Sequence, residues 1–145
     1  MKENFDKAFE FIMRWEGYKS NDPDDSGGRT IFGISERSHS EVVKRLWDMP
    51  KAEAREEAKI FYKTEYWDRT HGDSLPDKID IFAFDTAVNI GISQSSWITD
   101  EGLNNLFDCF IMRLRYYSQI AKYGNNIKYL RGWLNRVIDL WEYLK

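Results

Sequence analysis

The chain has 145 residues, 42% of them hydrophobic and 16% aromatic, which is enough for one hydrophobic core and too little for two ordinary domains. Its net charge of −3, with basic and acidic residues mixed along the chain, excludes an overall field suited to a polyanion, so nucleic acid is not an expected partner. The single cysteine, Cys109, excludes an intramolecular disulfide. We predict one domain over residues 1–145 and a monomeric protein.

The first residues carry charges of both signs and lack the apolar stretch of a secretory signal. No run in the sequence approaches the roughly 18 apolar residues of a membrane-spanning helix. We therefore expect synthesis in the cytoplasm without a signal peptide, and no stable membrane insertion.

The predicted elements begin with an amphipathic helix over residues 4–15, whose apolar side chains recur at spacings of three and four before Gly17 ends it. Residues 21–28 are the densest cluster of turn formers in the chain, and the β-prone residues 30–34 follow. This order predicts a loop that leads into a strand or tight hairpin, with two or three strands in all.

The remainder of the chain has helical periodicity. We predict a short helix at 41–48, a helix opened by Pro50 that runs to Tyr66 and is broken at 72–76, a core helix at 79–90, and two last helices at about 100–122 and 126–144. The fold class is mainly α: a helical bundle with a small β hairpin near the N-terminus.

Glu16 falls at the last turn of the first predicted helix, where the negative end of the helix dipole favours the protonated carboxyl group that a general acid needs. The loop offers a second carboxylate as Asp22, Asp24 or Asp25, and Thr30 follows on the strand. A glycosidase uses such a pair, with one carboxyl group protonating the leaving oxygen while the other holds the attacking water. By itself, however, a glutamate before a glycine at a helix end is usually a solvated surface residue.

The loop has two other interpretations. Its carboxylates are also the residues that build Asx turns and so only shape a loop. The spacing of Asp22, Asp24, Ser26 and Gly27 fits the first half of an EF-hand calcium loop, but the closing position holds Gly33 where a bidentate glutamate is needed. We predict no metal and no cofactor.

Several motifs extend the pattern around Glu16 over most of the chain: Glu16-Gly17, Asn21-Asp22-Pro23-Asp24-Asp25-Ser26-Gly27-Gly28-Arg29-Thr30, Phe32-Gly33-Ile34-Ser35, Met49-Pro50-Lys51-Ala52-Glu53-Ala54, Tyr66-Trp67-Asp68, Phe84-Asp85-Thr86-Ala87-Val88-Asn89-Ile90-Gly91 and Gly132-Trp133-Leu134-Asn135-Arg136-Val137. Together they resemble glycoside hydrolase family 108, whose members are N-acetylmuramidases, some of them described as secretion activators. The resemblance implies an α+β lysozyme-like fold and a hydrolase of bacterial peptidoglycan with Glu16 as its general acid.

The order of Glu16, Asp25 and Thr30 is also similar to the glutamate, aspartate and threonine order of phage-type lysozymes, which invert the anomeric centre. That likeness implies that Asp25 and Thr30 place the attacking water. The step from Asn89 to Gly91 resembles a helix end that lines the cleft in those enzymes, which implies that Asn89 and Asp85 lie near the sugar.

Further substrate contacts are expected from Tyr18 and Asp22 beside the acid, and from Tyr66 and Trp67, although aromatic residues at helical spacing are more often core residues. The sequence departs from the family where Glu-Gly-Gly-Tyr reads Glu16-Gly17-Tyr18-Lys19, so the wall next to the acid differs. It also departs after Gly91, where many relatives carry a small peptidoglycan-binding-like insert and this chain is short.

The leading hypothesis is therefore an N-acetylmuramidase that acts on peptidoglycan strands. The alternative is a catalytically weak peptidoglycan-binding or secretion-assisting module that uses the same groove, and a third is a helical interaction domain. A phage endolysin that passes a holin or another export partner fits the sequence as well as a bacterial wall-remodelling enzyme. Either would act at the cell wall or in the periplasm after non-classical release.

Overall fold

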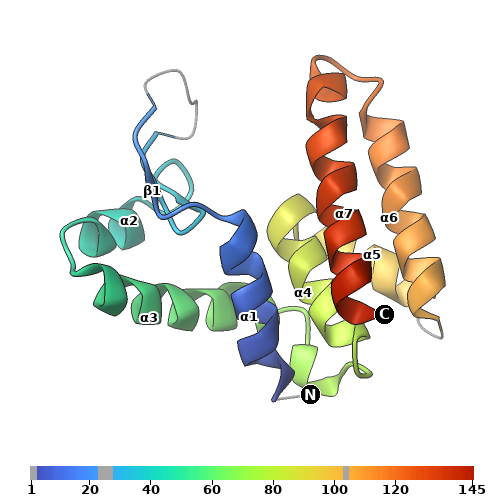
Figure 1. The fold of residues 1–145 in the computed structure, drawn as a ribbon, viewed down its shortest axis with the longest axis horizontal. Coiled ribbons are helices and arrows are strands. Elements are labelled where there is room, and N and C mark those ends of the chain that lie inside the picture. Colours follow the sequence, from blue (N-terminus) through green and yellow to red (C-terminus); the bar gives the residue numbers. More distant parts are fainter. Residues whose placement is uncertain (1–2, 23–27, 103–104) are drawn as a thin grey trace. The chain divides into compact units, whose positions relative to one another are not determined.

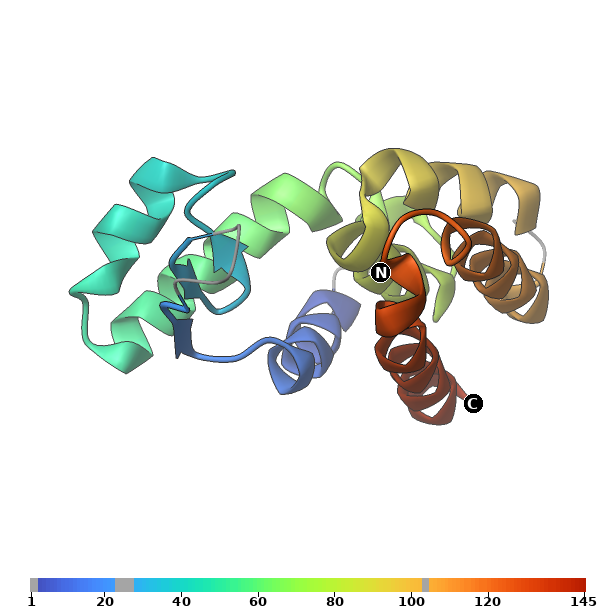
Figure 2. The same cartoon turned by 90° about the horizontal axis from the view of Figure 1, so that it is seen from above.

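The computed structural model describes residues 3–22, 28–102 and 105–145. Over these residues it contains seven α-helices and one three-stranded antiparallel sheet, β1-β2-β3 (Figure 1 and Figure 2). The predicted mainly α class with a small β element near the N-terminus is confirmed. No helix of the described residues is long and apolar enough to cross a membrane.

The chain forms two compact units, which we name the N-terminal unit (residues 6–65) and the C-terminal unit (residues 1–5 and 66–145). The chain passes from one unit to the other within its first helix and again near residue 65. The single domain over residues 1–145 stays a prediction, and each unit is described by itself.

The N-terminal unit holds the sheet and the first three helices, and the chain leaves it through a single π-helix. Its elements are α1 (Asn4–Trp15), β1 (Lys19–Ser20), β2 (Thr30–Ile31), β3 (Ile34–Ser35), α2 (Ser40–Trp47), α3 (Lys51–Tyr62) and η1 (Lys63–Trp67). The first two residues of α1 and the last two of η1 belong to the C-terminal unit. The helix predicted from Pro50 onward is confirmed as α-helix up to Tyr62. Its last predicted turn, which contains Tyr66, is π-helical.

The sheet is a short meander with a fixed register. Ile31 pairs with Lys19 on one side and with Ile34 on the other, so only two residues, Phe32 and Gly33, connect β2 to β3. Both of these residues have positive φ values, 49° and 80°, as a type I′ hairpin turn requires. The tight hairpin expected from residues 30–34 is therefore present.

Apolar side chains from α1, α2, α3 and β2 form the core of the N-terminal unit. Its fully buried members include Phe9, Ile12, Ile31, Val43, Leu46, Ala54 and Ala58. The helix α1 contributes one face at helical spacing, and β2 contributes its inward residue, so burial of these groups supplies the main stabilisation of the unit.

The C-terminal unit is helical throughout its described residues. Its elements are η2 (Gly72–Ser74), α4 (Ile79–Ile90), α5 (Ile92–Gly102), α6 (Leu106–Ile120), η3 (Asn126–Tyr129) and α7 (Leu130–Leu144). The central helix is α4, whose residues 79–87 are all buried. The core helix predicted at 79–90 is thus confirmed with the same bounds.

The prediction of one helix over residues 100–122 is wrong. Helix α5 ends at Gly102, and α6 begins after Asn105, whose side chain caps it by accepting a hydrogen bond from the backbone N–H of Phe107 at 2.9 Å. Gly102 packs so closely on Cys109 that an added Cβ would lie 2.7 Å from Sγ. Apolar residues on both sides of the break hide it from a search for periodicity, whereas the asparagine cap is the local signal for it.

Candidate active site

Glu16 lies at the C-terminal end of α1, as predicted. Its backbone N–H donates to the carbonyl of Ile12 at 3.0 Å, so it completes the last turn of the helix. The neighbouring turns are anchored by Phe9 and Ile12, which are fully buried. The side chain of Glu16 is half-buried. The sequence therefore places this carboxyl group at a helix end whose direction is set by the core.

The carboxyl group of Glu16 packs directly on the turn between β2 and β3. A Cβ added to Gly33 would lie 2.6 Å from Oε2 of Glu16 and 2.8 Å from its Cδ and Cγ atoms. Real Cβ atoms do not approach other atoms so closely, and the φ of +80° at Gly33 also disfavours any residue with a side chain. The end of α1 and the hairpin turn thus meet at a glycine that leaves room for the acid.

The turn that carries Gly33 is held from two sides. The backbone N–H of Phe32 donates to the carbonyl of Tyr18 at 2.7 Å, and the hydroxyl of Tyr62 donates to the carbonyl of Phe32 at 2.8 Å. These bonds fix Phe32 at a φ of 49°, a conformation that costs free energy for a residue with a side chain. A strained turn fixed in this way presents a defined surface to Glu16.

Tyr18 stands next to this turn among cationic side chains. Its ring is half-buried and contacts the ring of Phe32 at a centroid distance of 5.1 Å. The ammonium group of Lys51 lies 4.9 Å from the Tyr18 ring centroid, and that of Lys19 lies 5.3 Å from it. Lys19 also lies 4.8 Å from the ring of Trp47. We name Tyr18, Lys19, Arg29, Trp47 and Lys51 the cation–aromatic cluster.

Arg29, the remaining cation of this cluster, lies 4.8 Å from the ring of Trp47 and also ties the two ends of the hairpin together. Its guanidinium donates to both carboxylate oxygens of Glu36, at 2.8 and 3.0 Å, and the backbone N–H of Glu36 donates to the carbonyl of Arg29 at 2.8 Å. The hydrogen bond from Arg29 lowers the pKa of Glu36, which keeps that carboxyl group ionised. This ion pair was not predicted from the sequence, although its members directly flank β2 and β3.

The other predicted catalytic residues lie partly outside the described structure. Thr30 is half-buried in β2, in register with Ser20 and Ser35, and Asp22 is exposed just after β1. Asp25 lies outside the described residues, as do the other residues of the loop between 23 and 27. The water-placing roles of Asp25 and Thr30 stay predictions, and so do the substrate contacts of Tyr18 and Asp22.

Trp67 is a core residue of the C-terminal unit. Its indole is completely buried, with the rings of Phe5 and Phe84 at 5.5 and 5.7 Å, and its Nε1 donates to Asp73 at 2.8 Å. No face of this ring is open to a sugar, so the expected stacking does not fit Trp67. Tyr66 is half-buried in η1, and its contact with substrate stays a prediction.

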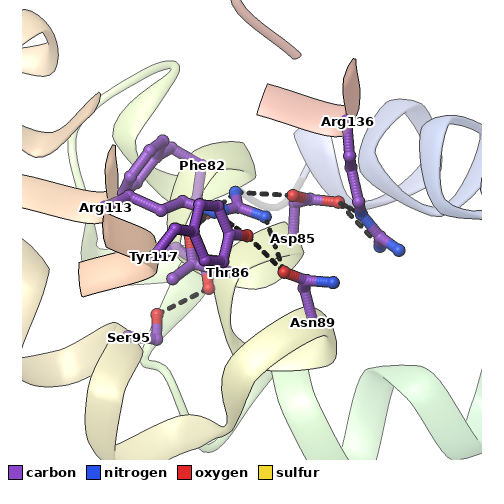
Figure 3. A network of polar contacts seen from close by, with 9 residues as sticks. Phe82, Asp85, Thr86, Asn89, Ser95, Arg113, Tyr117 and Arg136 are labelled. Carbon is purple, nitrogen blue, oxygen red and sulfur yellow. Dashed lines mark hydrogen bonds and ion pairs between the residues drawn. The ribbon is translucent and has the colours of Figure 1, made fainter. Parts of the chain in front are cut away.

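Asp85 is the shared counter-ion of two arginines from the last two helices. One carboxylate oxygen accepts from Arg113 at 2.7 Å and the other from Arg136 at 2.9 Å, and Figure 3 shows the two guanidinium groups reaching Asp85 from opposite sides. The side chain of Asp85 is 1% exposed. Because its oxygens are used in these bonds and closed off from solvent, the expected sugar contact does not fit Asp85 in this structure.

Asn89 lies one helical turn further along α4 and closes the same network. Its Oδ1 accepts hydrogen bonds from the hydroxyl of Tyr117 and from Arg113 at 3.3 Å (Figure 3). Burial raises the pKa of the Tyr117 phenol, which keeps it protonated as a donor. Asn89 is half-buried, and its proposed position near the sugar stays a prediction.

The comparison with protein families identifies the family of the chain. The model named "Glycosyl hydrolase 108" matches residues 9–91, which is more than half of the chain. The chain belongs to glycosyl hydrolase family 108. The matched residues include Glu16, the hairpin and α4, whereas α5, α6 and α7 come after them. Family membership supports a glycosidase, with a lysozyme-like function on peptidoglycan in general terms.

A solved structure, "Structure of Brucella abortus SagA", has the same fold as this member of the family. The two chains are 22% identical, the match covers 97% of this chain and 92% of that one, and the TM-score is 0.75. The predicted lysozyme-like, mainly α fold is thereby confirmed. No curated protein sequence matches the chain.

Metal-binding groups are not gathered at this site in the part of the chain that is described. Over residues 3–22, 28–102 and 105–145, no three histidine, cysteine, aspartate or glutamate side chains are placed to hold a metal ion. The chemistry that the described site offers is that of one positioned carboxyl group beside cationic and aromatic side chains.

Proposed function

We propose that this member of glycosyl hydrolase family 108 is an N-acetylmuramidase, which hydrolyses the bond from N-acetylmuramic acid to N-acetylglucosamine in peptidoglycan. The observation that carries the proposal is the position of the Glu16 side chain. Glu16 completes the last turn of α1, and its half-buried carboxyl group packs against Gly33, in a turn that is hydrogen-bonded to Tyr18 and Tyr62.

Glu16 acts as the general acid. Its proton passes to the glycosidic oxygen as the bond from that oxygen to the anomeric carbon breaks, so the leaving sugar departs as an alcohol. Since general acid catalysis depends on the position of the proton, a carboxyl group fixed against backbone is better suited than a free surface glutamate.

Asp25 and Thr30 supply the second half of the reaction in this proposal. Asp25 accepts a proton from the attacking water, and the hydroxyl of Thr30 helps to hold that water on the face of the sugar opposite the leaving group. The oxygen of the water then bonds to the anomeric carbon with inversion. Thr30 belongs to the same unit as Glu16 and lies in β2, the strand that precedes the turn on which the Glu16 side chain packs.

The cation–aromatic cluster supports an acidic glycan as the substrate. Peptidoglycan carries carboxylates on its lactyl groups and stem peptides, and the cluster offers the ammonium groups of Lys19 and Lys51 beside the rings of Tyr18 and Trp47. Aromatic rings stack on sugar faces, while the cations attract the carboxylates. The replacement of a family glycine by Tyr18 thus adds a ring to the wall of the site.

The test compares wild type with Glu16→Gln on purified peptidoglycan, measuring loss of turbidity and released reducing ends. Glutamine keeps the shape of the side chain and lacks the acidic proton. We expect a loss of at least about a hundredfold, the lower range for general acid catalysis. Glu10→Gln is the matched control, because Glu10 lies on the same helix but is 61% exposed and pairs with Arg55; it should cut as wild type does.

Two outcomes would overturn the proposal. If Glu16→Gln cuts as fast as wild type, another residue is the acid. If wild type releases no reducing ends yet sediments with the cell wall, the chain is the binding or secretion-assisting module that was the alternative from its sequence.

A further inference from the structure

An apolar groove runs between α6 and α7 of the C-terminal unit. It encloses about 370 Å³ and its wall is formed by apolar side chains, among them Phe107, Ile111, Leu114, Leu134, Ile138 and Trp141. Two of these, Phe107 and Ile138, are 55% and 58% exposed. A contiguous exposed patch of large apolar side chains is typical of an interaction surface, whereas single exposed apolar side chains are not.

The charges beside the groove are separated by sign along its length. Residues 113–133 carry five arginines and lysines and no aspartate or glutamate. Of these, Arg113 is buried against Asp85, whereas Arg115 on α6 and Arg131 on α7 are exposed. At the other end, Asp108 on α6 and Glu142 on α7 are exposed. Each helix therefore has an acidic residue at one end of the groove and a basic residue at the other.

On both helices, the change from acidic to basic residues falls at the same height along the groove. Helices α6 and α7 lie side by side and run in opposite directions, with the rings of Phe107 and Trp141 6.3 Å apart (Figure 1). Phe107 thus marks the same level as Trp141. The midpoint between Asp108 and Arg115 on α6 lies as many residues inward from this contact as the midpoint between Arg131 and Glu142 on α7. The two midpoints are therefore level with each other.

We propose that a second copy of this chain covers the groove. The two copies pack α6 on α6 and α7 on α7 in opposite directions, about a two-fold axis that crosses the groove at this common level. Arg115 then faces the partner's Asp108, and Arg131 faces the partner's Glu142. A two-fold contact repeats each pair, so four ion pairs surround the apolar centre. This assignment departs from the monomer expected from the sequence.

The charge pattern favours a second copy over an anionic surface. A membrane or polyanion carries one sign of charge and would require basic residues along the whole groove, but its far end is acidic. A reversed copy of the groove presents the complementary sign at both ends. Glu142 also pairs with Lys145 on its own helix, but both side chains are more than half exposed, so this pair is readily exchanged.

The experiment measures the mass of the full chain in solution by sedimentation velocity across a concentration series. Wild type should move from monomer to dimer as its concentration rises. Ile138→Glu, which places a charge in the centre of the groove at a 58% exposed position, should remain monomeric while melting at about the wild-type temperature.

Charge reversal tests the orientation. Arg131→Glu puts like charges opposite each other twice in the dimer and should weaken it at least about tenfold. Combining it with Glu142→Arg restores opposite charges, so the double variant should recover dimerisation. The proposal is overturned if wild type stays monomeric at every concentration, or if the double variant is as weak as Arg131→Glu. Binding of monomers to vesicles of anionic phospholipid, without dimerisation, would also overturn it.

Discussion

Replacing Gly33 with alanine tests whether packing on Gly33 controls the position of the Glu16 carboxyl group. The added Cβ would lie 2.6 Å from Oε2 of Glu16, whereas ordinary contacts lie at 3.4 Å or more. The carboxyl group must therefore retreat by about 1 Å, a displacement that can reduce a catalysed rate about a hundredfold. The positive φ of Gly33 and the crowding together should lower the free energy of unfolding by about 2–3 kcal/mol.

A second glycine separates displacement of the acid from strain of the backbone. Gly28 also has a positive φ, +70°, but a Cβ there would meet its nearest atom, Oε2 of Glu36, at an ordinary 3.5 Å. Gly28→Ala should lose about 1 kcal/mol of stability and keep its activity. Gly17→Ala, next to Glu16 with no atom within 4 Å of the added Cβ, should keep its activity as well.

The assay is the rate of release of reducing ends from peptidoglycan, measured at a temperature where chemical denaturation shows every variant to be folded. We expect Gly33→Ala to lose activity about a hundredfold beyond Gly28→Ala. A role of Gly33 in positioning Glu16 is refuted if folded Gly33→Ala cuts at the wild-type rate, or if Gly28→Ala loses as much activity as Gly33→Ala does.

Two further predictions concern the C-terminal unit. Asp85→Asn leaves Arg113 and Arg136 buried without their counter-ion, so urea denaturation should show that the free energy of unfolding falls by about 3–5 kcal/mol. Glu10→Gln breaks an exposed pair and should change it by less than about 1 kcal/mol. Equal effects would contradict the assignment of Asp85 as a structural residue. Burial raises the pKa of Cys109 to about 11, so the thiol should resist a disulfide reagent at pH 8 until denaturant unfolds the chain, and rapid labelling of the native protein would be the contrary result.

Local signals in the sequence were sufficient for the long periodic helices. The bounds of α1 and α4 were predicted to the residue, because in each helix a run of apolar residues at spacings of three and four ends before a glycine. The hairpin followed from turn formers next to β-prone residues. Glu16 could be placed at a helix end for the same reason, since only the end of α1 had to be known.

Contacts between distant parts of the chain were beyond such signals. The contact between Glu16 and Gly33 depends on how the hairpin folds back on α1, and the partners of Asp85 lie 28 and 51 residues further along the chain. The burial of Trp67 likewise depends on Phe5 and Phe84. The start of α5 at Ile92 was missed because Gly91 ends one helix and the next begins at once.

The most direct test of the central claim identifies the sugar at each new chain end. Peptidoglycan is digested with wild type or Glu16→Gln, the new ends are reduced with borohydride, and the products are analysed by mass spectrometry. The proposal predicts reduced N-acetylmuramic acid from wild type and at least about a hundredfold less of it from Glu16→Gln. Reduced N-acetylglucosamine, or equal amounts of product from the two proteins, would contradict it.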